Sequence, residues 1–139
     1  MNEYKYEDIY KGQVEEFTFE ITQEKMKQFY SISGDKNPLH TDANYAKSKG
    51  YDEVVVYGLL TTSALSTLAG VYLPGKYSLI HSVEISYAKP VFLSSSPLKV
   101  KGEVIEKDDR FSRITIKVTI SDKNGAKVCR GKMQIGVIC

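Results

Sequence analysis

The sequence is poor in the residues that build disulfides and metal centres. Of its 139 residues only two are cysteines, Cys129 and Cys139, and two are histidines, His40 and His81. No CxxC pair or zinc-ligand spacing is present, so free thiols in a reducing compartment are the simplest interpretation. A chain of this length can bury enough apolar surface to be stable as one domain, residues 1–139, without either device.

The chain also lacks an excess of charge and a long hydrophobic run. Its formal charge is +2, with basic residues spread along the chain, which argues against a nucleic-acid-binding face. No segment reaches the length of a membrane span, and the polar N-terminal stretch MNEYKYEDIYKGQ lacks the apolar core of a signal peptide. We therefore expect a cytoplasmic protein that binds neither nucleic acid nor membrane.

Helical patterns dominate the first half of the chain. An alternating strand at 14–22 precedes a helix that Thr22 caps, Gly34 ends, and whose apolar residues are Met26, Phe29, Tyr30 and Ile32. A short helix capped by Asp42 follows. Residues 59–73 then predict a helix with almost no charge and with apolar residues on every side, which should be buried all round.

Strand patterns occupy the second half. Residues 78–91, 97–107, 110–121 and 126–137 carry alternating apolar residues, and DKNG supplies a hairpin turn before the last strand. His81 shares an apolar strand face and is expected to be structural. Helices followed by consecutive antiparallel strands predict an α+β domain, in which a bent sheet wraps the apolar helix.

One loop pairs an acid with an imidazole. In GDKNPLH, Gly34 ends a helix and Pro38 stiffens the middle, so that Asp35 and His40 can be held in one relative position. Histidine is the side chain best suited to proton transfer near neutral pH, and a nearby carboxylate can orient it or act as its partner. Asn37 could hold a water or a carbonyl group. The same residues also make a good structural turn, and they supply too few ligands for a metal site.

Gly58 stands at the start of the apolar helix. Unpaired N–H groups and the positive end of the helix dipole at such a position can polarise a carbonyl, as an oxyanion hole does. A glycine needed only for the turn into the helix is the structural alternative.

These segments resemble a known family. FYSISGDKNPLHTDANYA, VYGLLTTSALSTLAGVYLPGKYS and VEISYAKPVFL are similar to the characteristic segments of the MaoC-like hydratases, the (R)-specific enoyl-CoA hydratases. The first segment is highly specific, with Asp35, Asn37, Pro38 and His40 all matching. The resemblance extends from about Phe17 to the end of the chain.

The resemblance implies a hot-dog fold, usually as a homodimer, and reversible addition of water to a trans-2-enoyl thioester without a cofactor. It implies that Asp35 and His40 are the acid/base pair, that the Gly58 N–H binds the thioester oxygen, and that Ser63 lies near the pair. Tyr57 departs from the family pattern, which often has histidine there, and is interpreted as a change in pocket shape or in the support of the site.

Three alternatives remain open at this stage. The chain could be a 3-hydroxyacyl-ACP dehydratase, a hot-dog acyl-CoA thioesterase, or a non-catalytic domain that binds acyl thioesters. The intact Asp-x-Asn-Pro-x-His segment argues against the last two. The sequence leaves open the acyl chain length, CoA or acyl-carrier protein as carrier, the direction of the reaction, and which member of the pair is the base.

Overall fold

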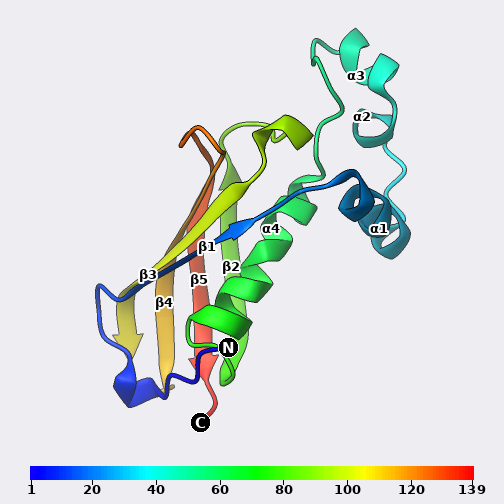
Figure 1. Ribbon diagram of the computed structural model, residues 1–139. Helices are drawn as coiled ribbons and strands as arrows, with labels where there is room; N and C mark the ends of the chain where they lie inside the picture. Colours follow the sequence, from blue (N-terminus) through cyan, green and yellow to red (C-terminus); the bar gives the residue numbers. More distant parts are fainter.

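The computed structural model describes residues 1–139 and is built around one antiparallel sheet and one long helix (Figure 1). The strands are β1 (Val14–Phe19), β2 (Ser78–Tyr87), β3 (Leu98–Asp108), β4 (Arg113–Ser121) and β5 (Lys127–Val137). They pair in the order β1-β3-β4-β5-β2, with every pairing antiparallel. The predicted α+β hot-dog arrangement is confirmed.

Four helices connect β1 to β2. They are α1 (Gln23–Ser33), α2 (Pro38–Thr41), α3 (Ala43–Ser48) and α4 (Gly58–Thr67). Helix α4 lies along one face of the sheet, whereas α1, α2 and α3 project beyond one of its ends (Figure 1). None of these helices is both long and apolar enough to cross a membrane. The α2 turn was not predicted, because its four residues read as loop in the sequence.

The core lies between α4 and the inner face of the sheet. Strict alternation in β4 points Ile114, Ile116, Val118 and Ile120 inward, where all four are fully buried. Leu60, Ala64, Leu65 and Leu68 meet them from the helix side in one cluster of 24 buried residues. Burying each large aliphatic side chain contributes roughly 1.5–3 kcal/mol, so this layer holds α4 against the sheet.

The prediction of one helix over 59–73, buried on all faces, is wrong in two respects. The α-helical hydrogen bonding ends at Thr67, and a wider π-type turn covers Leu68–Tyr72. Along the side of α4 away from the sheet, Ser63 and Ser66 are exposed and the side chain of Leu59 is 69% exposed. The sheet covers only part of the helix, and the remaining stripe has no cover within this chain.

The cap predictions on either side of the acid–imidazole loop are confirmed. The Thr22 side chain accepts a hydrogen bond from Lys25 N at the start of α1, and Asp42 accepts bonds from Asn44 N and Tyr45 N at the start of α3. Of the apolar residues of α1 only Met26 is buried, and the side chain of Ile32 is 84% exposed, because α1 projects from the sheet.

Candidate active site

The loop that carries Asp35 and His40 is ordered by its own side chains. Gly34 adopts a left-handed conformation with φ of 71°, and its N–H bonds to Tyr30 O, which ends α1. Asp35 Oδ1 then accepts a hydrogen bond from Asn37 N at 3.0 Å. Asn37 Oδ1 accepts one from Leu39 N, also at 3.0 Å, and so caps α2. These local bonds hold Asp35 and His40 in fixed relative positions.

His40 lies on α2 with one ring nitrogen already committed. Its Nδ1 is 2.6 Å from the backbone oxygen of Val55. Because a carbonyl oxygen can only accept a hydrogen bond, Nδ1 must carry the proton in this contact. In the neutral ring Nε2 then has the free lone pair, so that it can accept a proton from a reactant.

Tyr57 contacts both Asp35 and His40. Its side chain is buried, and its ring centroid is 4.3 Å from that of His40 and 4.9 Å from that of Phe29. The Tyr57 hydroxyl donates a hydrogen bond to the backbone oxygen of Asp35 at 2.9 Å. Burial, followed by the negative charge of Asp35 and the neighbouring Tyr30, raises the pKa of Tyr57. The hydroxyl therefore stays protonated and keeps its role as a donor.

Gly58 begins α4 directly after Tyr57. No side chain caps this end, and the first bonds of the helix run from Leu60 N and Thr61 N to Tyr57 O. The N–H groups of Gly58 and Leu59 come before those bonds and are available at the positive end of the helix dipole. This end of α4 can therefore bind an oxygen on which negative charge develops.

These residues face a common cavity of about 220 Å³. It is lined by Phe29, Asp35, His40, Tyr57, Gly58, Leu59 and Tyr87. Four of the predicted site residues, Asp35, His40, Tyr57 and Gly58, thus meet at one place although they come from a loop, α2 and the start of α4. The cavity offers a carboxylate, an imidazole and a helix N-terminus to one bound molecule.

Two further cavities adjoin the same histidine. One of about 250 Å³ also contains Gly58 and Tyr87, and its other walls are Val55, Val56, Thr61, Ala88, Lys89, Pro90 and Val91. The other, of about 380 Å³, lies against α1 and is lined by Gln23, Met26, Lys27, Tyr30, Ser31, His40, Thr41 and Tyr57. His40 therefore borders three hollows, and the 250 Å³ one, which it shares with Gly58, is lined largely by apolar residues.

Two predicted site residues are not brought to this cavity. The side-chain oxygen of Asn37 is used to cap α2, so its contribution here is to shape the loop. Ser63 lies on the exposed stripe of α4, where its hydroxyl donates to Leu60 O at 2.6 Å. Neither residue lines any of the three hollows around His40.

Tyr87 and Leu59 line the cavity but were not predicted as site residues. In the sequence Tyr87 is one aromatic residue in an alternating strand, and nothing in that pattern marks it as a site residue. Its position follows from the sheet order, which places the end of β2 beside the start of α4. Only the packed chain brings the two ends together.

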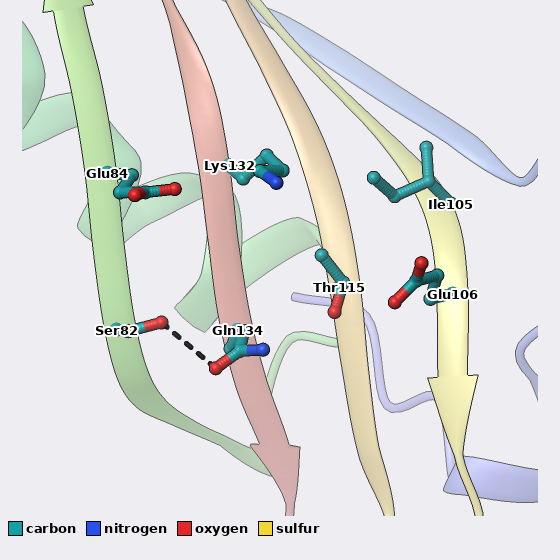
Figure 2. Close-up of a pocket in the computed structure, with 7 residues that line it drawn as sticks. All are labelled: Ser82, Glu84, Ile105, Glu106, Thr115, Lys132 and Gln134. Atoms are coloured by element: carbon teal, nitrogen blue, oxygen red, sulfur yellow. Dashed lines mark hydrogen bonds between the residues drawn. The ribbon is translucent and has the colours of Figure 1, made fainter.

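The outer face of the sheet carries a different, polar hollow of about 350 Å³. Figure 2 shows its residues, Ser82, Glu84, Ile105, Glu106, Thr115, Lys132 and Gln134, on strands in front of the helices. Ser82 donates to Gln134 at 3.2 Å. His81 lies where the β2 register shifts between Ile80 and Ser82, with its ring against Gly136. This face lacks an acid–imidazole pair, and no group of three or more potential metal ligands gathers anywhere in the structure.

Several known proteins resemble this chain in sequence. The model of the MaoC like domain family matches residues 8–126. The chain is 31% identical over 91 residues to the (R)-specific enoyl-CoA hydratase of Aeromonas caviae, covering 65% of this chain and 68% of that protein. It is 28% identical over 120 residues to 3-hydroxybutyryl-CoA dehydratase of Methylorubrum extorquens, covering 85% and 76%.

Solved structures of similar proteins share the fold of this chain. The (R)-hydratase of A. caviae involved in PHA biosynthesis superposes with a TM-score of 0.87 at 26% identity, covering 93% of this chain and 97% of that one. An unliganded R-hydratase from Pseudomonas aeruginosa gives a TM-score of 0.85 at 27% identity, covering 96% and 84%.

Proposed function

The chain belongs to the MaoC-like domain family, and from this premise we propose that it is a hydro-lyase that adds water reversibly to trans-2-enoyl thioesters, giving the (R)-3-hydroxyacyl product. One observation carries the proposal. Asp35, His40 and the N-terminus of α4 at Gly58 line a single cavity. The names of the relatives, which include both an enoyl-CoA hydratase and a hydroxyacyl-CoA dehydratase, support the same reaction class.

The proposed reaction begins with polarisation of the thioester. The carbonyl oxygen binds at the Gly58 N–H, which draws electron density from the conjugated double bond and makes the β-carbon electrophilic. A water molecule held between Asp35 and His40 attacks that carbon while His40 Nε2 takes one of its protons. Electrons move onto the thioester oxygen as the new carbon–oxygen bond forms.

Protonation of the α-carbon completes the addition. The proton that His40 took from the water passes to the Asp35 carboxylate, which delivers it to the α-carbon, so that both residues return to their starting protonation states. The net change is the addition of one H and one OH across the double bond, and dehydration follows the same steps in reverse. The same geometry also permits the two residues to exchange roles.

A direct assay tests the proposal. Crotonyl-CoA hydration is followed by loss of the conjugated-thioester absorbance, and the stereochemistry of 3-hydroxybutyryl-CoA is determined by chiral analysis. We expect turnover to the (R)-product. Failure of the folded protein to consume trans-2-enoyl thioesters of four to eight carbons, carried on CoA or on acyl-carrier protein, would refute the hydratase function. Release of free CoA from a saturated acyl-CoA would identify a thioesterase instead.

We further propose that the chain works as a homodimer. The uncovered stripe of α4 contains Leu59, and the neighbouring edge strand β2 exposes apolar side chains, with Leu79 53%, Val83 47% and Tyr87 46% exposed. Apolar residues on an unpaired edge strand, beside a helix stripe of which Leu59, Ser63 and Ser66 are exposed, favour pairing with a second copy. Light scattering tests this proposal. The expected mass is twice 15.6 kDa, and a Val83→Lys variant should shift the protein toward monomer.

Two other predictions accompany the function. Water addition moves only protons and water, so we propose that the enzyme needs no metal or organic cofactor, and turnover should survive dialysis against a chelator. We also propose a cytoplasmic location, which cell fractionation would test.

A further inference from the structure

Tyr87 lies at the boundary between two of the hollows around His40. It is the last residue of β2 and lines both the 220 Å³ cavity that contains Asp35 and the 250 Å³ cavity beyond it. The two cavities also share His40 and Gly58. They differ in their other walls, because the larger one is lined mainly by Val55, Val56, Ala88, Pro90 and Val91, together with Thr61 and Lys89.

The Tyr87 ring is packed against the start of α4. A β-carbon placed on Gly58 would lie 3.1 Å from Cε1 of Tyr87 and 3.4 Å from its Cζ. At that spacing even a methyl group on Gly58 would require the ring or the helix backbone to shift. The ring therefore stands beside the N–H groups that the proposed reaction uses.

A short hydrogen-bond chain holds the ring in this position. Thr62 Oγ1 donates to Gly58 O at 3.2 Å and lies 2.9 Å from the Tyr87 hydroxyl oxygen. Since the single proton of Thr62 is committed to Gly58 O, Tyr87 must be the donor in the second contact. In the single chain the Tyr87 side chain is 46% exposed, so the hydrogen bond to Thr62 and the contact with Gly58 are what hold the ring in place.

We propose that Tyr87 is a specificity-determining residue that separates the reacting carbons from an acyl-tail pocket. The inference rests on the proposed function and extends it to the substrate class. The α- and β-carbons of the substrate occupy the cavity with Asp35, and the apolar walls beyond Tyr87 receive the distal carbons. With the ring held by Thr62, short-chain enoyl thioesters fit, whereas longer tails require the ring to move.

The test compares kcat/KM for trans-2-enoyl-CoA substrates of four, six, eight and ten carbons. Tyr87→Leu removes the ring and its hydroxyl but keeps an apolar side chain. We expect this variant to raise the ratio of kcat/KM for eight carbons over four carbons by about 10-fold, the discrimination typical of a changed apolar pocket. Tyr87→Phe removes only the hydrogen bond to Thr62, whereas Thr62→Val removes that bond and the one to Gly58 O; both should change the ratio in the same direction by a smaller factor.

Tyr10 supplies matched controls. Its side chain is 63% exposed and lies outside all three hollows, so Tyr10→Leu and Tyr10→Phe should leave the ratio unchanged. Circular dichroism and thermal unfolding establish that each variant is folded. The mild Tyr87→Phe and Thr62→Val changes keep the test valid should Tyr87→Leu fold poorly.

Two outcomes distinguish failure of this inference from failure of the function. Equal loss of kcat/KM at all chain lengths in the Tyr87 variants would reduce Tyr87 to a structural role and overturn the inference. If the wild type turns over none of the substrates, the hydratase function fails, and calorimetric binding of butyryl-CoA and octanoyl-CoA then tests the pocket alone. A wild-type preference for butyryl-CoA that Tyr87→Leu reduces would support the inference, and an unchanged preference would overturn it.

Discussion

The hydroxyl of Tyr57 donates a hydrogen bond to the backbone oxygen of Asp35 at 2.9 Å, while its ring packs on His40 with centroids 4.3 Å apart. One buried side chain therefore contacts both members of the proposed catalytic pair. Asp35 follows the end of α1 and His40 lies on the separate turn α2, so Tyr57 joins two segments that the loop alone connects.

Tyr57→Phe is expected to lower kcat for crotonyl-CoA by up to about 10-fold, because it removes one neutral hydrogen bond of about 1 kcal/mol that holds the Asp35 backbone. KM should change less, since the cavity keeps its shape. Steady-state kinetics separate the two constants, and Tyr45→Phe is a suitable control because the Tyr45 hydroxyl makes no side-chain hydrogen bond in the structure. A Tyr57→Phe enzyme with wild-type kcat would show that the packing of the ring on His40 positions the pair without the hydrogen bond to Asp35.

Asp35→Asn and His40→Gln are each expected to reduce kcat by on the order of 10²–10⁴-fold, the usual contribution of a positioned acid or base. Both substitutions keep the approximate size of the side chain and remove its ability to exchange a proton. Because the two residues act as a unit, the double variant should be little worse than either single one. Retention of more than a tenth of the wild-type kcat in either single variant would contradict the assignment.

Gly58→Ala should lower kcat/KM, because the new β-carbon would lie 3.1 Å from the Tyr87 ring and force one of them to shift. The substitution keeps the backbone N–H, so its effect reports on space rather than on loss of the donor. In a double-mutant cycle, Tyr87→Leu should relieve much of the loss, with a coupling free energy of roughly 0.5–3 kcal/mol. If the effects of the two substitutions on kcat/KM were strictly additive, a clash between the new β-carbon and the Tyr87 ring would not be the cause of the loss.

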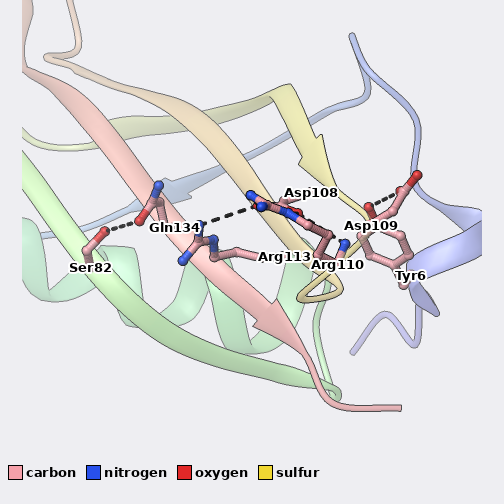
Figure 3. A network of polar contacts seen from close by, with 7 residues as sticks. All are labelled: Tyr6, Ser82, Asp108, Asp109, Arg110, Arg113 and Gln134. Atoms are coloured by element: carbon pink, nitrogen blue, oxygen red, sulfur yellow. Dashed lines mark hydrogen bonds and ion pairs between the residues drawn. The ribbon is translucent and has the colours of Figure 1, made fainter.

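Tyr6 links the N-terminal turn to the end of β3, away from the site. Its hydroxyl donates to Asp109 Oδ1 at 2.6 Å, beside the cluster of Asp108, Arg110 and Arg113 (Figure 3). Burial, followed by the hydrogen bond to Asp109 and the negative charges of Asp109 and Asp108, raises the pKa of Tyr6 to about 12.

This raised pKa predicts a pH-dependent loss of stability. The folded state binds the phenol proton more tightly than the unfolded state, whose ordinary value is about 10. The stabilisation by Tyr6 is therefore complete below pH 10 and is lost as the pH rises from about 10 toward 12. Thermal unfolding of wild type and Tyr6→Phe should differ by a few degrees at pH 8 and progressively less above pH 10. A difference in unfolding temperature that stays constant from pH 8 to pH 12 would contradict a raised pKa for Tyr6.

Local patterns in the sequence determined the elements and the acid–imidazole loop. Period-two alternation predicted β4 and β5, because one face of each strand must be buried, and the caps at Thr22, Gly34 and Asp42 follow from backbone groups that any helix leaves unpaired. The sequence alone showed Asp35 and His40 together, because both lie in one short segment of the chain.

Tertiary packing decided which residues share the cavity. Tyr87 meets Gly58 only because the fold places the end of β2, an edge strand, beside the start of α4, and 28 residues of chain separate the two. The same packing leaves a stripe of α4 uncovered and leaves Ser63 outside the hollows around His40, although the apolar composition of the helix predicts burial on every side. Contacts between distant segments depend on how the elements are stacked, and hydrophobic periodicity within one segment carries no record of that arrangement.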